Sequence, residues 1–192
     1  QKGRLREFWQ FNADVFGAGA MGEIEILKLS VSLLQSFGAT HEHFEIQVND
    51  RRFVDFVFQG ILGFQDDTNK KLYKLIDAKN KMGEEKFYDE VNKITQSEEK
   101  TKIFQAFTEL RSVEDIKNFI GRFFDSVTLS DFYYSSTAAP VAISSHVKPL
   151  YHFFEQIQHF GLSHYVRFEP SVVRGLDYYT GLVFEIFDKH PD

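Results

Sequence analysis

The sequence predicts an α+β fold in which strands near the two ends of the chain enclose a mostly helical middle. Both ends are rich in aromatic and β-branched residues, as is typical of strands. Between residues 64 and 160, apolar residues recur at steps of three and four with charged residues between them, which indicates amphipathic helices. We therefore expect a core segment at 1–63, a helical insertion at 64–160 and a second core segment at 161–192.

The composition restricts the kinds of protein that fit. The 192 residues, 43% of them apolar, suffice for one substantial domain with an insertion. Cysteine is absent, which excludes a disulfide framework and a thiol nucleophile, and the seven histidines are scattered, so we predict no metal site. A net charge of −6 is unlike that of a nucleic-acid binder that works alone. No apolar run reaches the roughly 18 residues that span a bilayer, and we expect no membrane association.

The first predicted element is a strand at 5–15, which contains neither proline nor glycine. On such a strand Gln10 and Asp14 share one face, with their Cα atoms about 13 Å apart. An amide and a carboxylate on one face can hydrogen-bond a polar ligand. An edge strand whose polar face meets water is the plain alternative.

Three elements are expected next: a helix at 23–37, a strand at 44–48 and a helix at 51–59. Gly38 is the expected stop of the first helix, since glycine commonly follows a helix end. Asn49 and Asp50 are placed to cap the second helix.

The helical middle is predicted from apolar spacing around residues 72–76, 87–94 and 103–110, followed by a last helix at about 148–160 that ends at Gly161. Small residues at 135–140 break the helices. A strand at 165–168 then returns the chain to the sheet, and a final strand follows Gly181.

The segment from Arg174 to Gly181 carries the most chemistry. Arg174 offers a planar, permanently charged fork suited to a carboxylate or a phosphate. Tyr178 and Tyr179 point to opposite faces of an extended backbone, so one can line a pocket while the other packs beneath it. A glycine-rich hairpin with a structural pair between Arg174 and Asp177 is the alternative.

These residues resemble a known family. Arg-Gly-Leu-Asp-Tyr-Tyr-Thr-Gly at 174–181, followed by Val-Phe-Glu, is similar to the histidine-specific motif of histidyl-tRNA synthetases, which are class II aminoacyl-tRNA synthetases. Residues 3–17 resemble the second half of class II motif 2. The Asn-x-Arg step at 49–51 also fits, although helix capping explains Asn49 equally well. The resemblance implies an antiparallel class II sheet flanked by helices, with a mostly helical insertion domain.

The resemblance also implies a role for each motif residue at the histidine pocket. Gln10 would contact the polar head of the amino acid, and Asp14 would accept an imidazole N–H. Arg174 would be catalytic, neutralising charge as the histidine carboxylate attacks the α-phosphate. Tyr178 and Tyr179 would line the pocket, with Tyr179 on the imidazole.

The implied reaction is the ATP-dependent formation of histidyl-adenylate from L-histidine, followed by transfer of histidine to tRNA(His). Mg²⁺ would accompany the nucleotide. Arg4 and Arg6, at the end of the motif 2 loop, would meet phosphates of ATP or tRNA, although Arg6 fits a solvated side chain as well. A cytoplasmic homodimer is implied for the full-length enzyme.

Motif 1, the first half of motif 2, motif 3 and an anticodon domain are not recognisable. We therefore expect an internal part of such an enzyme that is inactive alone. Two alternatives stay open: a catalytically silent regulatory subunit of ATP phosphoribosyltransferase that senses histidine, and a synthetase-like module of a signalling protein that binds uncharged tRNA.

Overall fold

A computed structural model of the chain describes residue 7 and residues 10–124, 141–173 and 179–190. Its centre is a three-stranded sheet in the order β2-β1-β3, formed by β1 (Phe44–Asp50), β2 (Val166–Phe168) and β3 (Leu182–Asp188). β1 is antiparallel to β3 and parallel to β2, with Val48 opposite both Phe184 and Phe168. The α+β class is confirmed, but the described sheet is mixed. A long helical connection from β1 to β2 lets the chain re-enter the sheet in the same direction.

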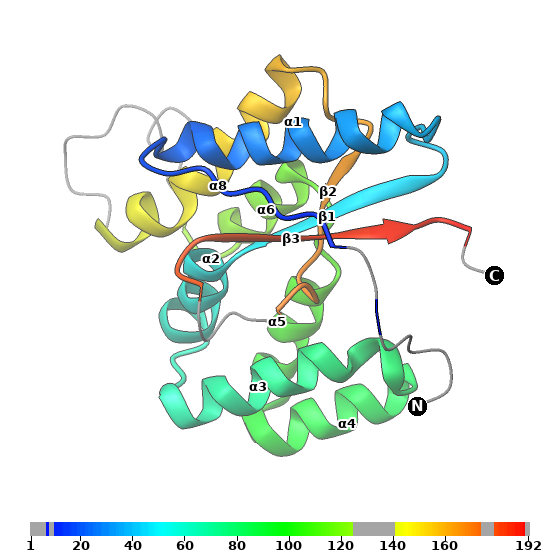
Figure 1. The fold of residues 1–192 in the computed structure, drawn as a ribbon. Coiled ribbons are helices and arrows are strands. Elements are labelled where there is room, and N and C mark those ends of the chain that lie inside the picture. The colour runs from blue at the N-terminus through cyan, green and yellow to red at the C-terminus, as the bar shows by residue number, and fades with distance from the viewer. Residues whose placement is uncertain (1–6, 8–9, 125–140, 174–178, 191–192) are drawn as a thin grey trace.

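Two long helices, α1 (Ala20–Ser36) and α8 (Val141–His159), pack together with one face of β1 (Figure 1). This core contains Ile24, Leu27 and Val31 of α1, Phe44, Ile46 and Val48 of β1, and Phe153 and Ile157 of α8. The helix expected at 23–37 is thereby confirmed. It ends as predicted, because Gly38 adopts a φ of 86° and the N–H of Ala39 bonds the carbonyl of Leu34 at 3.1 Å.

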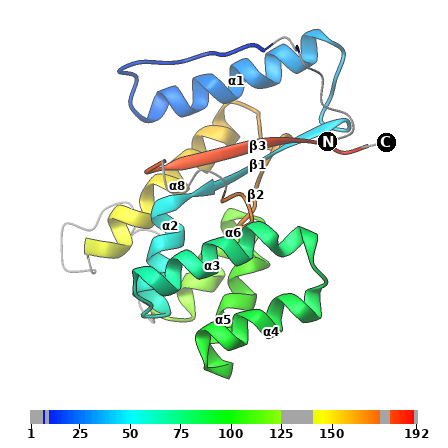
Figure 2. The same ribbon diagram turned by 60° about the horizontal axis from the view of Figure 1, so that its bottom comes forward.

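The other α-helices among the described residues gather below the sheet in the view of Figure 2. They are α2 (Arg51–Asp55), α3 (Asp66–Ala78), α4 (Glu84–Thr95), α5 (Glu98–Thr108) and α6 (Val113–Gly121). A π-helical turn at Phe56–Ile61 continues α2, so the helix expected at 51–59 is present. α3, α4 and α5 confirm the amphipathic pattern.

The last predicted helix starts earlier than expected. α8 begins at Val141 rather than near residue 148, and Pro149 lies inside it. Proline lacks the N–H for one backbone hydrogen bond of a helix interior, but this helix continues through it. The breaking residues expected at 135–140 lie outside the described residues.

Phenylalanine fills the core below the sheet. The side chains of Phe53, Phe58, Phe87, Phe104, Phe107 and Phe168 are all fully buried. Phe53 stands edge-on to Phe168 of β2 with ring centroids 5.7 Å apart, and it contacts Phe107 of α5 at 6.1 Å. One apolar cluster therefore joins the sheet to the helical middle. The domain boundaries at 63/64 and 160/161 stay predictions.

The strand expected at 5–15 is wrong for the part that the structure describes. Residues 10–16 form no helix or strand and run alongside α1 (Figures 1 and 2). Phe11 and Phe16 are exposed, at 66% and 91%. Aromatic residues favour a strand only where a neighbouring strand supplies ladder hydrogen bonds and packing. Among the described residues, no helix is long and apolar enough to cross a bilayer.

Candidate functional site

The two flanks of the predicted histidine motif meet at the carboxyl end of β1. Arg174 and Tyr178 lie outside the described residues, as do Arg4 and Arg6, so their assignments stay predictions. The chain entering the motif is buried at Val172, and the chain leaving it is exposed at Tyr179 (52%) before joining β3.

Asn49, the last but one residue of β1, holds the entering flank. Its side chain is fully buried, and its Nδ2 donates to the carbonyl oxygens of Pro170 at 3.1 Å and Val172 at 3.2 Å. The helix cap is Asp50, whose side chain accepts from the N–H of Arg52 at 2.8 Å. Capping therefore does not explain Asn49, and its contacts point instead to the motif.

The leaving flank is held by the first turn of α2. The backbone N–H of Arg51 donates to the carbonyl of Gly181 at 3.0 Å. The Arg52 guanidinium makes two hydrogen bonds to the buried carboxylate of Asp50, and these raise the pKa of Arg52 above its ordinary value. A Cβ on Gly181 would lie 3.5 Å from Nη2 of Arg52, so the guanidinium packs against this turn.

A cavity of about 380 Å³ adjoins this turn, between residues 13–19, the start of α1 and the start of β3. Its lining includes Asp14, Glu23, Leu182 and Phe184. Burial raises the pKa of the Glu23 carboxyl, the positive charge of Arg52 opposes this, and the negative charge of Asp50 adds to it. The volume suits an amino-acid-sized ligand, and the two carboxylates favour one that carries N–H groups or positive charge.

The predicted site residues are only partly brought together. Asp14 lines the cavity, whereas Gln10 does not: it is exposed, and its Nε2 donates to Oδ1 of Asn12 at 2.8 Å. The strand pairing that would place both on one face is absent from residues 10–16. The sequence analysis did not single out Glu23. A carboxylate in the first turn of a helix is favourable for the helix itself, so its presence there does not indicate a ligand site.

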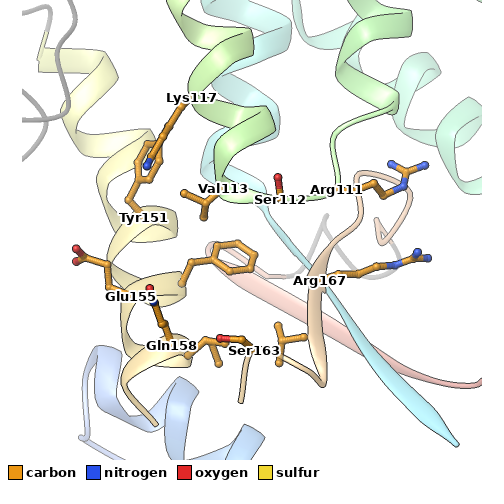
Figure 3. Close-up of a pocket in the computed structure, with 12 residues that line it drawn as sticks. Arg111, Ser112, Val113, Lys117, Tyr151, Glu155, Gln158, Ser163 and Arg167 are labelled. Carbon is orange, nitrogen blue, oxygen red and sulfur yellow. The ribbon is translucent and has the colours of Figure 1, made fainter. Parts of the chain in front are cut away.

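A second cavity, of about 440 Å³, opens between α6, α8 and β2, away from the motif segments (Figure 3). Tyr151 and Lys117 contribute to its lining, whereas Arg111 and Arg167 extend their guanidinium groups away from it. Both arginines pair with Glu169, at 3.5 and 3.6 Å, and Arg167 also pairs with Glu45 at 3.0 Å. These charges are already balanced, so we assign this cavity no function.

Two solved structures share the fold. A histidyl-tRNA synthetase from Nostoc sp. PCC 7120 superposes with a TM-score of 0.69 at 20% identity, over 88% of this chain and 36% of that one. A protein from Bacillus halodurans, described as an ATP phosphoribosyltransferase regulatory subunit/histidyl-tRNA synthetase, gives 0.68 at 18% identity, over 91% and 41%. At these identities the likeness shows a shared fold.

Sequence comparison identifies the family. The family model for histidyl-tRNA synthetase matches residues 1–191, and the chain belongs to the histidyl-tRNA synthetase family. The histidine–tRNA ligases of Leptospira biflexa and Thermoplasma volcanium are 34% and 29% identical to it over 191 residues. Each match covers 98% of this chain and 39% of the relative, so the chain spans about two fifths of the length of these relatives.

Proposed function

We propose that the full-length protein is a histidine–tRNA ligase. It activates L-histidine with ATP to give histidyl-adenylate and pyrophosphate, then transfers histidine to tRNA(His). The observation that carries this proposal is the segment from Arg174 to Gly181, whose two flanks are held by Asn49 near the end of β1 and by Arg51 at the start of α2. Family membership along the whole chain supports it.

In this proposal each motif residue has a distinct task. Arg174 stabilises the charge that develops as the histidine carboxylate attacks the α-phosphate in line, so no covalent enzyme intermediate is needed. Asp14, which lines the cavity next to the motif turn, accepts an imidazole N–H. Tyr178 and Tyr179 line the pocket, with Tyr179 on the imidazole. Gln10, which lies outside the cavity lining in this structure, contacts the polar head of the amino acid.

The phosphate contacts and the partners belong to the same proposal. Arg4 and Arg6 contact phosphates, either those of ATP or those of the tRNA acceptor end. Mg²⁺ binds together with the nucleotide. The enzyme acts as a homodimer in the cytoplasm. The helices α3 to α6 carry near-balanced charge rather than a dense basic stripe, so we do not assign them the grip on tRNA.

The role of Arg174 is tested by Arg174→Ala in the full-length protein. Removing one donor that stabilises a transition state lowers kcat by about 10²–10³-fold. We expect histidine-dependent ATP–pyrophosphate exchange to fall by that factor, while the calorimetric Kd for histidine changes little. An unchanged exchange rate would contradict the assignment.

A silent regulatory subunit is the competing function. The Bacillus halodurans structure, at 18% identity, supports a shared fold and no more. The intact set of Gln10, Asp14, Arg174 and Tyr179 favours the ligase, since a histidine sensor needs no adenylation arginine. Histidine binding without any exchange would decide for the regulatory subunit.

A further inference from the structure

We propose that Asn49 is a positioning residue for adenylate formation, fixing the chain that leads into Arg174. This inference rests on the proposed ligase function. Asn49 touches neither histidine nor ATP in this account; it acts through the backbone of residues 170–172.

The hydrogen bonds of Asn49 are specific to an amide. Its Nδ2 donates to two carbonyl oxygens, those of Pro170 and Val172, and its Oδ1 accepts from the N–H of Asp50 at 2.9 Å. The two donors and the acceptor of the side chain are therefore all used, in a position with no solvent exposure. Aspartate has the same shape but lacks both donors and would set its oxygens against the carbonyls.

The contact lies close to the proposed catalytic group. Val172 precedes Arg174 by two residues, which is at most about 7 Å of chain. On the far side of the motif, Gly181 is held by the backbone N–H of Arg51, and Leu182 opposite Asp50 begins the pairing of β3 with β1. The end of β1 thus fixes both flanks of the motif.

The two anchors differ in how they can be changed. The leaving flank is held by backbone groups, which no side-chain substitution removes. The entering flank is joined to β1 by a side chain, that of Asn49, whose two hydrogen bonds to Pro170 and Val172 a substitution can remove. Because a misplacement of about 1 Å can cost 10²-fold in rate, loosening this flank is expected to slow the chemical step more than it weakens histidine binding.

The test compares Asn49→Ala with Asn69→Ala in the full-length protein. Asn69 is a matched control, because it is also buried (4% exposed) and its amide has no hydrogen-bond partner among the described residues. It lies on α3, which holds neither flank of the motif. Both variants are assayed for kcat and histidine KM in ATP–pyrophosphate exchange, and for the urea midpoint of unfolding.

We expect Asn49→Ala to lower kcat at least tenfold, which is less than the roughly 10²-fold loss that a misplacement of about 1 Å can cause. Histidine KM should stay within about threefold of wild type. Asn69→Ala should keep the wild-type kcat. Asn49→Ser, which restores a single donor, should recover part of the rate and provides a second variant if alanine prevents folding.

A folded Asn49→Ala or Asn49→Ser with wild-type kcat would overturn the positioning role. So would equal losses of kcat in the Asn49 and Asn69 variants, because that result would reflect general destabilisation. A wild-type protein without histidine-dependent exchange would instead overturn the proposed function itself.

Discussion

Replacing Arg52 with methionine removes the positive charge that balances the buried carboxylate of Asp50. The Asp50 side chain has no solvent exposure, whereas that of Arg52 is 34% exposed. The guanidinium donates Nε to Oδ1 at 2.9 Å and Nη2 to Oδ2, so both carboxylate oxygens are occupied. Methionine keeps most of the aliphatic stem, and the substitution therefore removes mainly the charge and its two hydrogen bonds.

The expected loss of stability follows from the burial of Asp50. Removing one partner of a buried ion pair costs about 3–5 kcal/mol, because the other charge is left uncompensated. Arg52 is partly solvated and its backbone N–H still bonds Asp50, so we expect the lower end of that range, about 3 kcal/mol. With a typical urea m-value of about 1–3 kcal/mol/M, the midpoint of unfolding should fall by about 1–3 M.

Lys102→Met is the matched control. Lys102 and Glu98 lie 2.6 Å apart, but their side chains are 71% and 82% exposed, so this substitution should leave the urea midpoint unchanged. Adding Asp50→Asn to Arg52→Met should restore part of the lost stability, since a neutral amide can still cap α2. The reasoning is refuted if Arg52→Met unfolds at the wild-type midpoint, or if Asp50→Asn destabilises it further.

The remaining predictions concern single groups. Tyr73→Phe removes the hydroxyl that donates to Asp55 at 2.7 Å and should cost about 1.5–3 kcal/mol in urea unfolding, as is usual for a hydrogen bond to a charged group. Tyr88→Phe, whose hydroxyl bonds are longer at 3.1 and 3.3 Å, should cost less. Gln96 has a φ of 50° at the end of α4, so Gln96→Gly should raise stability by up to about 1 kcal/mol in thermal unfolding; a loss of stability would contradict this. Burial raises the pKa of Glu23 above its ordinary 4.5, so the folded state binds this proton more tightly than the unfolded state, and wild type loses stability as pH rises past that value. Glu23→Gln should therefore gain stability relative to wild type above pH 4.5 and not below it; a pH-independent difference would rule out this cause.

The elements that local patterns determine were predictable from the sequence. Apolar spacing located α3, α4 and α5, and glycine located the end of α1 at Gly38, because burial of one helix face and a left-handed turn leave direct marks in the sequence. The residues 5–15 misled the same reasoning, since a strand also depends on a neighbour that local sequence does not report.

The motif residues of the site were predictable from the sequence, but the residues that hold the motif in place or line the cavity beside it were not. Asn49 looked like a helix cap, and only the structure reveals that it bonds a chain 121 and 123 residues away. Glu23 looked like a favourable charge at a helix start, and its place in the cavity beside Asp14 depends on how α1 packs against β3. Such contacts are long-range, so the local sequence carries no signal of the role of Glu23, and for Asn49 it offers only the Asn-x-Arg resemblance.

Histidine-dependent ATP–pyrophosphate exchange by the full-length protein tests the central claim most directly. The account predicts exchange that requires L-histidine, is not supported by other amino acids and is inhibited competitively by histidinol. Histidine binding in calorimetry with no exchange at any ATP concentration would contradict it and identify a histidine-sensing relative without ligase chemistry.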